Sequence, residues 1–277
     1  MPELLLSLTN LLNFYVRSAH SMANTHTPFF SVVIPITRIN SFLLKAIKSV
    51  LTQNLEPGEF ELILVDNSGG NLCLNEYCSK MNINGNNLQI YRQPVQLAIA
   101  QNWNSCISLC NGEYVHILHD DDWILEGFYR EIKSLIAQNP TCGLFATRTS
   151  FYSEDEVFMG ENARFPILEK GSTNANEIYL DNHLMCPGVI IKKSVYDQVG
   201  GFDESYQYVM DGDMWARVVR AYGGIVSSKA LACYRVHSSS FTSVYNRKAY
   251  NLIEKERLYA FRSKSYSDFP YNTARKH

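Results

Sequence analysis

The chain has 277 residues, of which 46% are hydrophobic and 19% carry a formal charge, and its net charge at pH 7 is -2. This length and apolar content provide for one large domain or two small ones with a buried core, and they exclude a disordered chain. The near-neutral charge argues against a nucleic-acid partner recruited by a global basic field.

The seven cysteines favour a reducing, cytoplasmic compartment. Their number is odd, they are scattered through apolar segments, and no pair has the Cys-x2-Cys spacing of a zinc site. A chain of this length also does not need disulfides to hold its fold.

Residues 1–28 are expected to form a leader ahead of the main domain. The segment LLLSLTNLLNFYVRSAH has apolar residues at helical spacing, but polar residues interrupt it. It therefore falls short of the roughly 20 apolar residues that a spanning helix needs. No positively charged region precedes it, which argues against a signal peptide. An amphipathic surface helix and a poorly ordered leader both stay open, and no later segment reads as a transmembrane helix.

Strand and helix patterns alternate from residue 29 to residue 138. Apolar runs predict strands at FFSVVIPI (29–36), FELILV (60–65), LQIYR (88–92) and EYVHIL (113–118). Apolar residues at helical spacing predict helices at 40–54, 72–80, 97–110 and 126–138. Asn40 and Ser41 are the expected cap of the first helix. The alternation is typical of βαβ units in a mostly parallel sheet, whose ligands bind at the carboxyl ends of the strands.

The pattern changes after about Asn139. Strands are predicted at GLFATRTSFYS (143–153) and CPGVIIKK (186–193), on either side of a polar stretch at 154–181 with little periodicity. A helix with acids in its first turn is predicted over 211–224, followed by the strand ALACYRVHSSS (230–240). A charged amphipathic helix at 245–264 is more typical of packing or dimer contacts than of catalysis. This half is interpreted as an acceptor-facing subdomain.

Three consecutive carboxylates, Asp120 to Asp122, follow the strand that ends at Leu118. Neighbouring acids repel one another, and a half-buried cluster of them is unstable unless positive charge lies among them. Mg²⁺ and Mn²⁺ bind carboxylate oxygens and commonly keep water and phosphate as further ligands. A solvated loop or a helix cap is the alternative. The position at a strand end favours a cation held against a diphosphate.

Six segments occur in order and at suitable intervals: SVVIPI, FELILVDNS, QLAIAQNWNSCISLCNGEYVHILHDDDW, CPGVIIKKSVYDQVGGFDES, MDGDMWARV and YRVHSSS. Together they resemble glycosyltransferase family 2, whose inverting enzymes have the GT-A fold and use nucleotide sugars. The resemblance extends from about Phe29 to Phe241. It implies an α/β fold with a Rossmann-like, mostly parallel central sheet flanked by helices and a mixed acceptor-side subdomain.

The same resemblance implies a division of the chain. A leader at 1–28 precedes a GT-A domain at 29–241, and a helical extension at 242–277 follows. Within the domain, 29–123 is the nucleotide-binding half and 124–241 the acceptor half.

On the donor side, the resemblance places Pro35 and Thr37 against the nucleoside. Asp66 matches the acid that hydrogen-bonds the base, commonly uracil, although an Asp there also favours a turn. Asp120 is expected to reach the ribose or a phosphate.

The family's metal motif is Asp-x-Asp-Asp before an apolar residue, and here His119 stands at the first Asp position. Asp121 is the expected metal ligand. Asp122 is a second candidate, with a helix cap or a bond to a neighbour as its alternative. Which acid contacts the metal directly stays open. His119 is expected near the donor but not as a ligand.

Two residues of YRVHSSS complete the donor site that the resemblance implies. His237 is assigned as a third metal ligand or phosphate contact, with a structural role as the alternative. Arg235 is assigned to neutralise the charge of the diphosphate. His116, inside a predicted strand, is expected to be a packed core residue.

Asp211 is the expected general base, because an inverting transfer needs one carboxylate beside the acceptor hydroxyl. A helix N-terminus would keep that carboxylate ionised. For Asp213 we expect a structural or acceptor-binding role.

The resemblance therefore implies an enzyme that uses Mn²⁺ or Mg²⁺ and a nucleoside-diphosphate sugar, with UDP as the expected nucleotide. The expected acceptor is a saccharide, free or lipid-linked, in synthesis of a bacterial surface polysaccharide such as lipopolysaccharide or capsule at the inner face of the cytoplasmic membrane. A homodimer and a peripheral membrane contact stay open. The alternatives are a nucleotidyltransferase, although IPITRINSF lacks the glycine-rich phosphate loop expected of one, and a non-catalytic sugar-nucleotide binding module.

Overall fold

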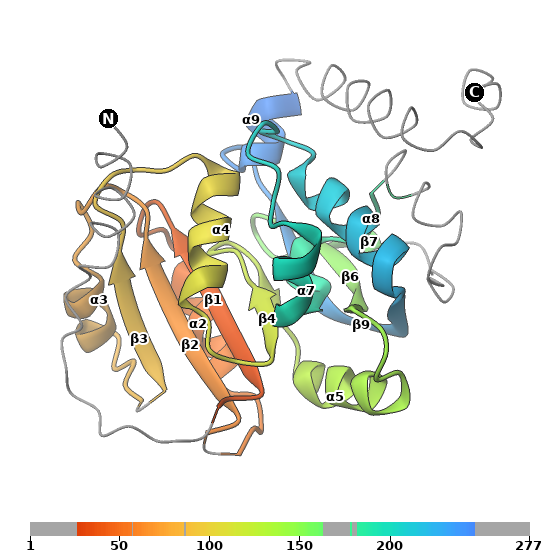
Figure 1. Ribbon diagram of the computed structural model, residues 1–277. Coiled ribbons are helices and arrows are strands. Elements are labelled where there is room, and N and C mark those ends of the chain that lie inside the picture. The colour runs from red at the N-terminus through yellow and green to blue at the C-terminus, as the bar shows by residue number, and fades with distance from the viewer. Residues whose placement is uncertain (1–26, 57, 86, 163–177, 179–181, 247–277) are drawn as a thin grey trace, which may run out of the picture.

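The computed structural model describes residues 27–56, 58–85, 87–162, 178 and 182–246. Its centre is a nine-stranded sheet with helices packed on both faces (Figure 1). Nearly all of the predicted leader and of the extension at 242–277 lies outside the described residues. Within the described part of the chain, no helix has the length and apolar character needed to cross a membrane.

The first half forms the parallel part of the sheet, as predicted. Its strands are β1 (Phe30–Ile36), β2 (Phe60–Asp66), β3 (Leu88–Arg92) and β4 (Tyr114–Ile117), in the spatial order β3-β2-β1-β4. The helices between them are α2 (Leu43–Leu51), α3 (Leu74–Lys80) and α4 (Ile99–Leu109). All three strand pairings are parallel.

The apolar runs of these strands follow from burial on both faces of the sheet. Along β1, Val33 packs in the same core as Trp103 of α4. Its neighbour Val32 faces the other way and packs in the same core as Leu43 of α2. A strand covered by helices on both sides needs apolar residues at successive positions rather than at alternate ones.

The second half adds antiparallel pairs to the same sheet. Its elements are β5 (Trp123–Ile124), α5 (Phe128–Gln138), β6 (Leu144–Ser153), β7 (Phe158–Glu161), the 3-10 turn η1 (Cys186–Gly188), β8 (Val189–Lys192), α7 (Lys193–Val199), α8 (Met210–Tyr222), β9 (Gly224–Val236) and α9 (Phe241–Asn246). Beyond β4 the order continues β8-β6-β9-β5. Strand β8 is antiparallel to β4 and to β6, and β9 is parallel to β6. The two predicted halves thus share one continuous sheet.

Several local features differ from the predictions. Residues 186–188, predicted as the start of a strand, form a 3-10 turn, because Pro187 has no N–H to give to a strand ladder. Strands β5 and β7 and helices α7 and α9 were not predicted. The expected boundary between residues 241 and 242 falls inside α9. The predicted helix at 245–264 lies outside the described residues beyond Asn246.

His116 is a packed core residue, as predicted. Its ring nitrogens lie 2.9 Å from the Tyr129 hydroxyl and 3.0 Å from the Pro187 carbonyl, and its ring stacks on Phe128. Burial lowers the pKa of His116 to about 4. The imidazole is therefore neutral at pH 7 and serves packing rather than proton transfer.

The start of α2 supports one half of the predicted cap. Asn40 Oδ1 accepts hydrogen bonds from the backbone N–H groups of Phe42 (2.9 Å) and Leu43 (2.8 Å). Ser41 is exposed. The Asn40 side chain therefore satisfies two donors that the helix itself leaves free.

Replacing Asn40 should destabilise the fold through this cap. We expect Asn40→Ala to lower the free energy of unfolding by about 1 kcal/mol, and Asn40→Ser, which keeps a capping oxygen, to lower it less. Ser41→Ala is the matched control. Urea unfolding followed by circular dichroism measures all three variants. Equal stability of Asn40→Ala and Ser41→Ala would show that the cap contributes nothing.

Candidate active site

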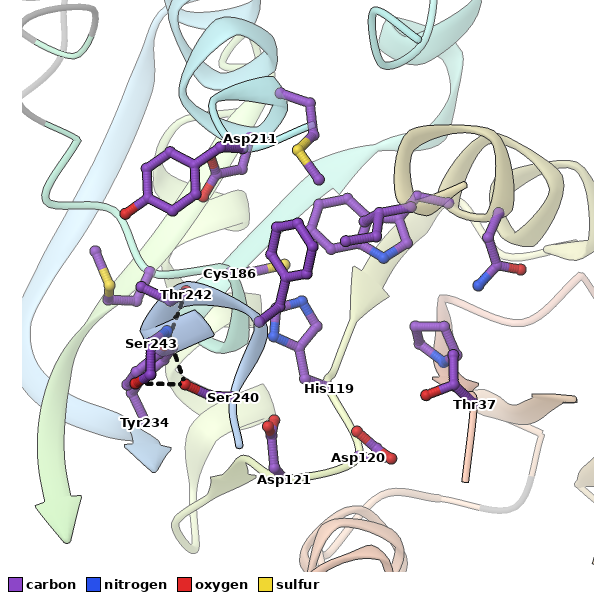
Figure 2. Close-up of a pocket in the computed structure, with 18 of the residues that line it drawn as sticks. Thr37, His119, Asp120, Asp121, Cys186, Asp211, Tyr234, Ser240, Thr242 and Ser243 are labelled. Carbon is purple, nitrogen blue, oxygen red and sulfur yellow. Dashed lines mark hydrogen bonds between the residues drawn. The ribbon is translucent and has the colours of Figure 1, made fainter. Parts of the chain in front are cut away.

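A cavity of about 750 Å³ is lined by residues from both halves of the chain (Figure 2). Five of the predicted site residues line it: Pro35, Thr37, Asp120, Asp121 and Asp211. They come from the ends of β1 and β4 and from the first turn of α8. The parallel half delivers its residues at the carboxyl ends of its strands, as the βαβ arrangement requires.

One predicted acid, Asp66, does not line the cavity but lies next to a residue that does. Asp66 is buried, its Oδ1 accepts hydrogen bonds from the backbone N–H and hydroxyl of Ser68, and its Oδ2 lies 3.5 Å from Arg92 Nε. The cavity wall is formed instead by the next residue, Asn67, which was not predicted. Asn67 is held by two hydrogen bonds with the backbone of Leu97. Asp66 therefore acts as the turn former that the sequence allowed, and a contact with a base stays a prediction.

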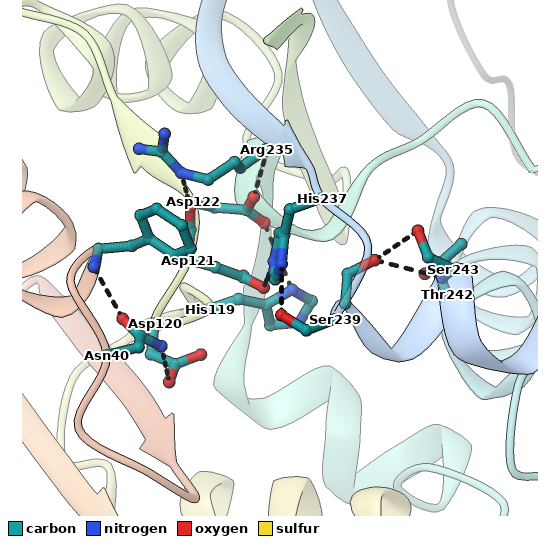
Figure 3. Close-up of polar contacts among 12 residues, drawn as sticks. Asn40, His119, Asp120, Asp121, Asp122, Arg235, His237, Ser239, Thr242 and Ser243 are labelled. Carbon is teal, nitrogen blue, oxygen red and sulfur yellow. Dashed lines mark hydrogen bonds and ion pairs between the residues drawn. The ribbon is translucent and has the colours of Figure 1, made fainter. Parts of the chain in front are cut away.

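Asp121 is held by the segment that follows β9. His237 Nε2 lies 2.9 Å from Asp121 Oδ2, and its other ring nitrogen lies 2.9 Å from Ser239 Oγ (Figure 3). Burial opposes ionisation of Asp121, but the hydrogen bond from His237 and the charges of His237 and His119 outweigh it and hold the pKa below its ordinary value. His237, which was predicted to be a third metal ligand or a phosphate contact, is thus a hydrogen-bond partner of Asp121, the predicted metal ligand.

Asp122 is almost fully buried. Its Oδ1 accepts a hydrogen bond from the backbone N–H of Arg235 (2.9 Å), and its Oδ2 lies 3.4 Å from His119 Nδ1. Oδ2 has no hydrogen-bond partner among the described residues. Burial, together with repulsion from Asp121, raises the pKa of Asp122 to about 6. This carboxylate is held on one oxygen and left unsatisfied on the other.

The Asp120 side chain points toward the loop between β1 and α2. Its Oδ2 accepts a hydrogen bond from Asn40 Nδ2 at 2.8 Å (Figure 3). Burial and repulsion from Asp121 raise the pKa of Asp120 to about 7, in spite of the opposing charges of His119 and Arg38. Asn40 therefore both caps α2 and orients an acid of the site, a link that local sequence patterns do not reveal.

Three of these side chains are close enough together to hold one cation. Among the described residues, one potential ligand atom from each of His119, Asp121 and Asp122 lies within 4.8 Å of the others. The predicted trio was Asp121, Asp122 and His237. His119, which was placed near the donor but not among the ligands, belongs to the group instead of His237.

Arg235 does not face the cavity. Its guanidinium lies between the rings of Phe42 (4.2 Å) and Trp123 (4.7 Å) and donates hydrogen bonds to the Asp121 carbonyl and to Glu156. The side chain is buried in this position. These contacts favour a structural role, in which Arg235 braces the acidic loop from behind, over the predicted contact with the diphosphate.

On the opposite side of the cavity, Asp211 stands in the first turn of α8. Its Oδ1 accepts a hydrogen bond from the Gly212 N–H (2.6 Å), and its Oδ2 accepts one from Asn182 Nδ2 (3.2 Å). Asp213 points away into the core and pairs with Arg217 Nε at 2.7 Å. Of the two acids in the DGD segment, Asp211 therefore lines the cavity and Asp213 has a structural role.

A wall of hydroxyl groups, which sequence reasoning missed, also lines the cavity. Figure 2 shows it: Ser240 Oγ donates to Ser243 Oγ (2.9 Å), and the Tyr234 hydroxyl donates to Thr242 Oγ1 (3.1 Å). Arg38, just after the end of β1, donates hydrogen bonds to Ser239 and so connects this wall to the parallel half of the sheet. The serine run in YRVHSSS was the available signal, but α9 places Thr242 and Ser243 on the wall.

The comparisons with known proteins agree with this geometry. The family model described as Glycosyl transferase family 2 matches residues 31–200, which is more than half of the chain. The chain is 29% identical over 126 residues to glycosyltransferase GlyG of Streptococcus pneumoniae, covering 46% of this chain and 40% of GlyG. It is 23% identical over 232 residues to the minor teichoic acid biosynthesis protein GgaB of Bacillus subtilis, covering 79% of this chain and 24% of GgaB.

A solved structure shares the fold. S. aureus TarS residues 1-349 in complex with UDP-GlcNAc superimposes with a TM-score of 0.61 at 17% sequence identity, covering 77% of this chain and 60% of that one. The chain spans less than two thirds of the length of each of these three proteins. The sheet order, the strand-end acids and the family match lead to one conclusion: this chain has a GT-A fold and is a glycosyltransferase that belongs to glycosyltransferase family 2.

Proposed function

We propose that this glycosyltransferase moves a sugar from a UDP sugar to an acceptor hydroxyl with inversion at the anomeric carbon, and that it needs a divalent cation. One observation carries the proposal. The carboxylates of Asp120 and Asp121 after β4 and the carboxylate of Asp211 on α8 line one cavity from two different elements. An inverting displacement needs this separation, with charge stabilisation at the leaving group and a base at the acceptor.

The acidic group fits a cation such as Mn²⁺ or Mg²⁺. Asp122 Oδ2 is buried without a hydrogen-bond partner among the described residues, and it faces the Nδ1 atom of His119 at 3.4 Å. A cation nearby would lower the raised pKa values of Asp120 and Asp122 and so keep both ionised. Asp121 and Asp122 would hold it, and it would supply charge neutralisation for the departing diphosphate.

Asp211 takes the acceptor proton in this proposal. The acceptor oxygen forms a bond to the anomeric carbon as its proton passes to Asp211, and the bond from that carbon to the diphosphate breaks with its electron pair. The Gly212 N–H and Asn182 hold the carboxylate in place. Attack from the face opposite the diphosphate inverts the configuration without a covalent intermediate. Pro35, Thr37 and Asn67 would position the nucleoside.

The donor and the pathway rest on the comparisons. UDP is supported by the complex of TarS with UDP-GlcNAc, and a surface polysaccharide is supported by the named role of GgaB in minor teichoic acid biosynthesis. We infer a saccharide or lipid-linked saccharide acceptor, in surface polysaccharide synthesis at the inner face of the cytoplasmic membrane. Neither a homodimer nor a peripheral membrane contact is needed for the chemistry.

Asp211→Asn should abolish transfer while leaving donor binding intact. Loss of a general base costs about 10²- to 10⁴-fold in rate, and the amide keeps the size of the side chain. UDP release from a panel of UDP sugars measures turnover, and calorimetry measures UDP affinity. Asp197→Asn, an exposed site on α7, is the matched control. Turnover near the parent level in Asp211→Asn would exclude this base.

UDP should stabilise the protein only together with a cation. At 100 times its dissociation constant a ligand adds about 2.7 kcal/mol to the stability of the folded state. Thermal unfolding with UDP and Mn²⁺, with and without EDTA, measures the effect. We expect EDTA to remove most of the shift, and Asp121→Asn to behave as the parent does in EDTA. An equal shift in EDTA would contradict cation-dependent binding.

A further inference from the structure

We propose that His119 is a nitrogen ligand of the cation, and that this ligand makes the site prefer Mn²⁺ over Mg²⁺. The inference rests on the proposed cation site and specifies its chemistry. It starts from the departure at the first position of the acidic motif, where an imidazole stands in place of a carboxylate. The structure places that imidazole inside the group of potential ligands rather than beside it.

The spacing of the atoms suits a shared cation. His119 Nδ1 and Asp122 Oδ2 are 3.4 Å apart. Neighbouring ligands of an octahedral ion with bonds of about 2.1 Å lie roughly 3 Å apart, so a small rotation of either side chain is sufficient. Asp121 completes the group within 4.8 Å and also lines the cavity, where a diphosphate would supply further oxygen ligands.

Each of the three side chains also contacts a residue outside the group. The His119 ring stacks on Trp103 with a centroid distance of 5.3 Å, Asp122 accepts the Arg235 N–H on its other oxygen, and His237 bonds Asp121. Partners of this kind orient ligands in metal sites. Asp122 Oδ2 is buried beside His119 and has no hydrogen-bond partner among the described residues, so a cation bound here would satisfy it.

The chemistry of the donor set then determines the preferred ion. Mg²⁺ takes oxygen ligands almost exclusively, whereas imidazole nitrogen suits transition-metal ions, and Mn²⁺ also accepts carboxylate oxygen. An imidazole in place of a carboxylate also removes one negative charge from the site. The nitrogen ligand therefore weakens the binding of Mg²⁺ more than that of Mn²⁺, whereas the lost charge weakens the binding of both ions.

A different role for His119 is a protonated counter-ion that neutralises Asp122. Burial lowers the pKa of His119, but Cys186 and Asp122 outweigh it and raise the pKa well above its ordinary value. A protonated His119 would move away when a cation binds and would not coordinate it. The cation would then have no nitrogen ligand, and a spectrum that detects nitrogen bound to Mn²⁺ distinguishes the two roles.

Pulsed electron paramagnetic resonance of the full chain with Mn²⁺ and UDP detects nitrogen bound to the ion. We expect a ¹⁴N coupling in the parent that changes to a ¹⁵N coupling when the protein is labelled with ¹⁵N-histidine. The coupling should disappear in His119→Asp and persist in His237→Asn, the matched control. If His119→Asp does not fold, the labelled parent and His237→Asn still decide the origin of the nitrogen. A coupling that is absent from the parent, or lost only in His237→Asn, would overturn the proposal.

Affinity measurements test the consequence for selectivity. Titration calorimetry in the presence of UDP gives the dissociation constants of Mn²⁺ and Mg²⁺. We expect His119→Asp to reduce the preference for Mn²⁺ over Mg²⁺, because a carboxylate oxygen suits both ions. An unchanged ratio would contradict a ligand role. Mn²⁺ bound without nitrogen overturns this inference alone, whereas no Mn²⁺ bound in the presence of UDP overturns the proposed cation dependence as well.

Discussion

The repulsion among Asp120, Asp121 and Asp122 is the constraint on which the arrangement of the site depends. Three adjacent carboxylates at a strand end are stable only when other parts of the chain meet them with donors and positive charge. The structure supplies these from far away in the sequence: Asn40 meets Asp120, and the segment after the middle of β9 meets the other two acids. A bound cation would supply the positive charge that these contacts leave lacking at Asp122 Oδ2.

The mixed half of the sheet explains how those distant residues arrive. Trp123 pairs with Cys233, and Ile124 pairs with Ala232, so that β9 runs antiparallel to the short strand that follows the acids. This pairing brings Arg235 and His237 to the acidic loop. The parallel half therefore presents the acids, and the antiparallel addition holds them. The strand is a structural part of the site even where its side chains do not line the cavity.

Much of this could be predicted from sequence, because the predictions depended on local patterns. Buried strands and amphipathic helices have periodicities that a short window contains, and the position of Asp121 and Asp211 follows from where a strand ends or a helix begins. The direction of the Arg235 side chain could not be predicted, because it depends on two aromatic rings from other elements. The same holds for the role of His119, which depends on how the loop after β4 folds back on itself. Asn67 was not predicted because the motif assigned the neighbouring residue, Asp66, to the nucleotide.

The central claim is that the acidic group holds the diphosphate of the donor through a cation. A crystal structure with Mn²⁺ and UDP tests it most directly. We expect an ion about 2.2 Å from carboxylate oxygens of Asp121 and Asp122, with the diphosphate bound to the same ion and the nucleoside beside Pro35 and Thr37. A nucleotide bound in the cavity with no ion at these carboxylates, or a diphosphate bound far from them, would contradict the claim.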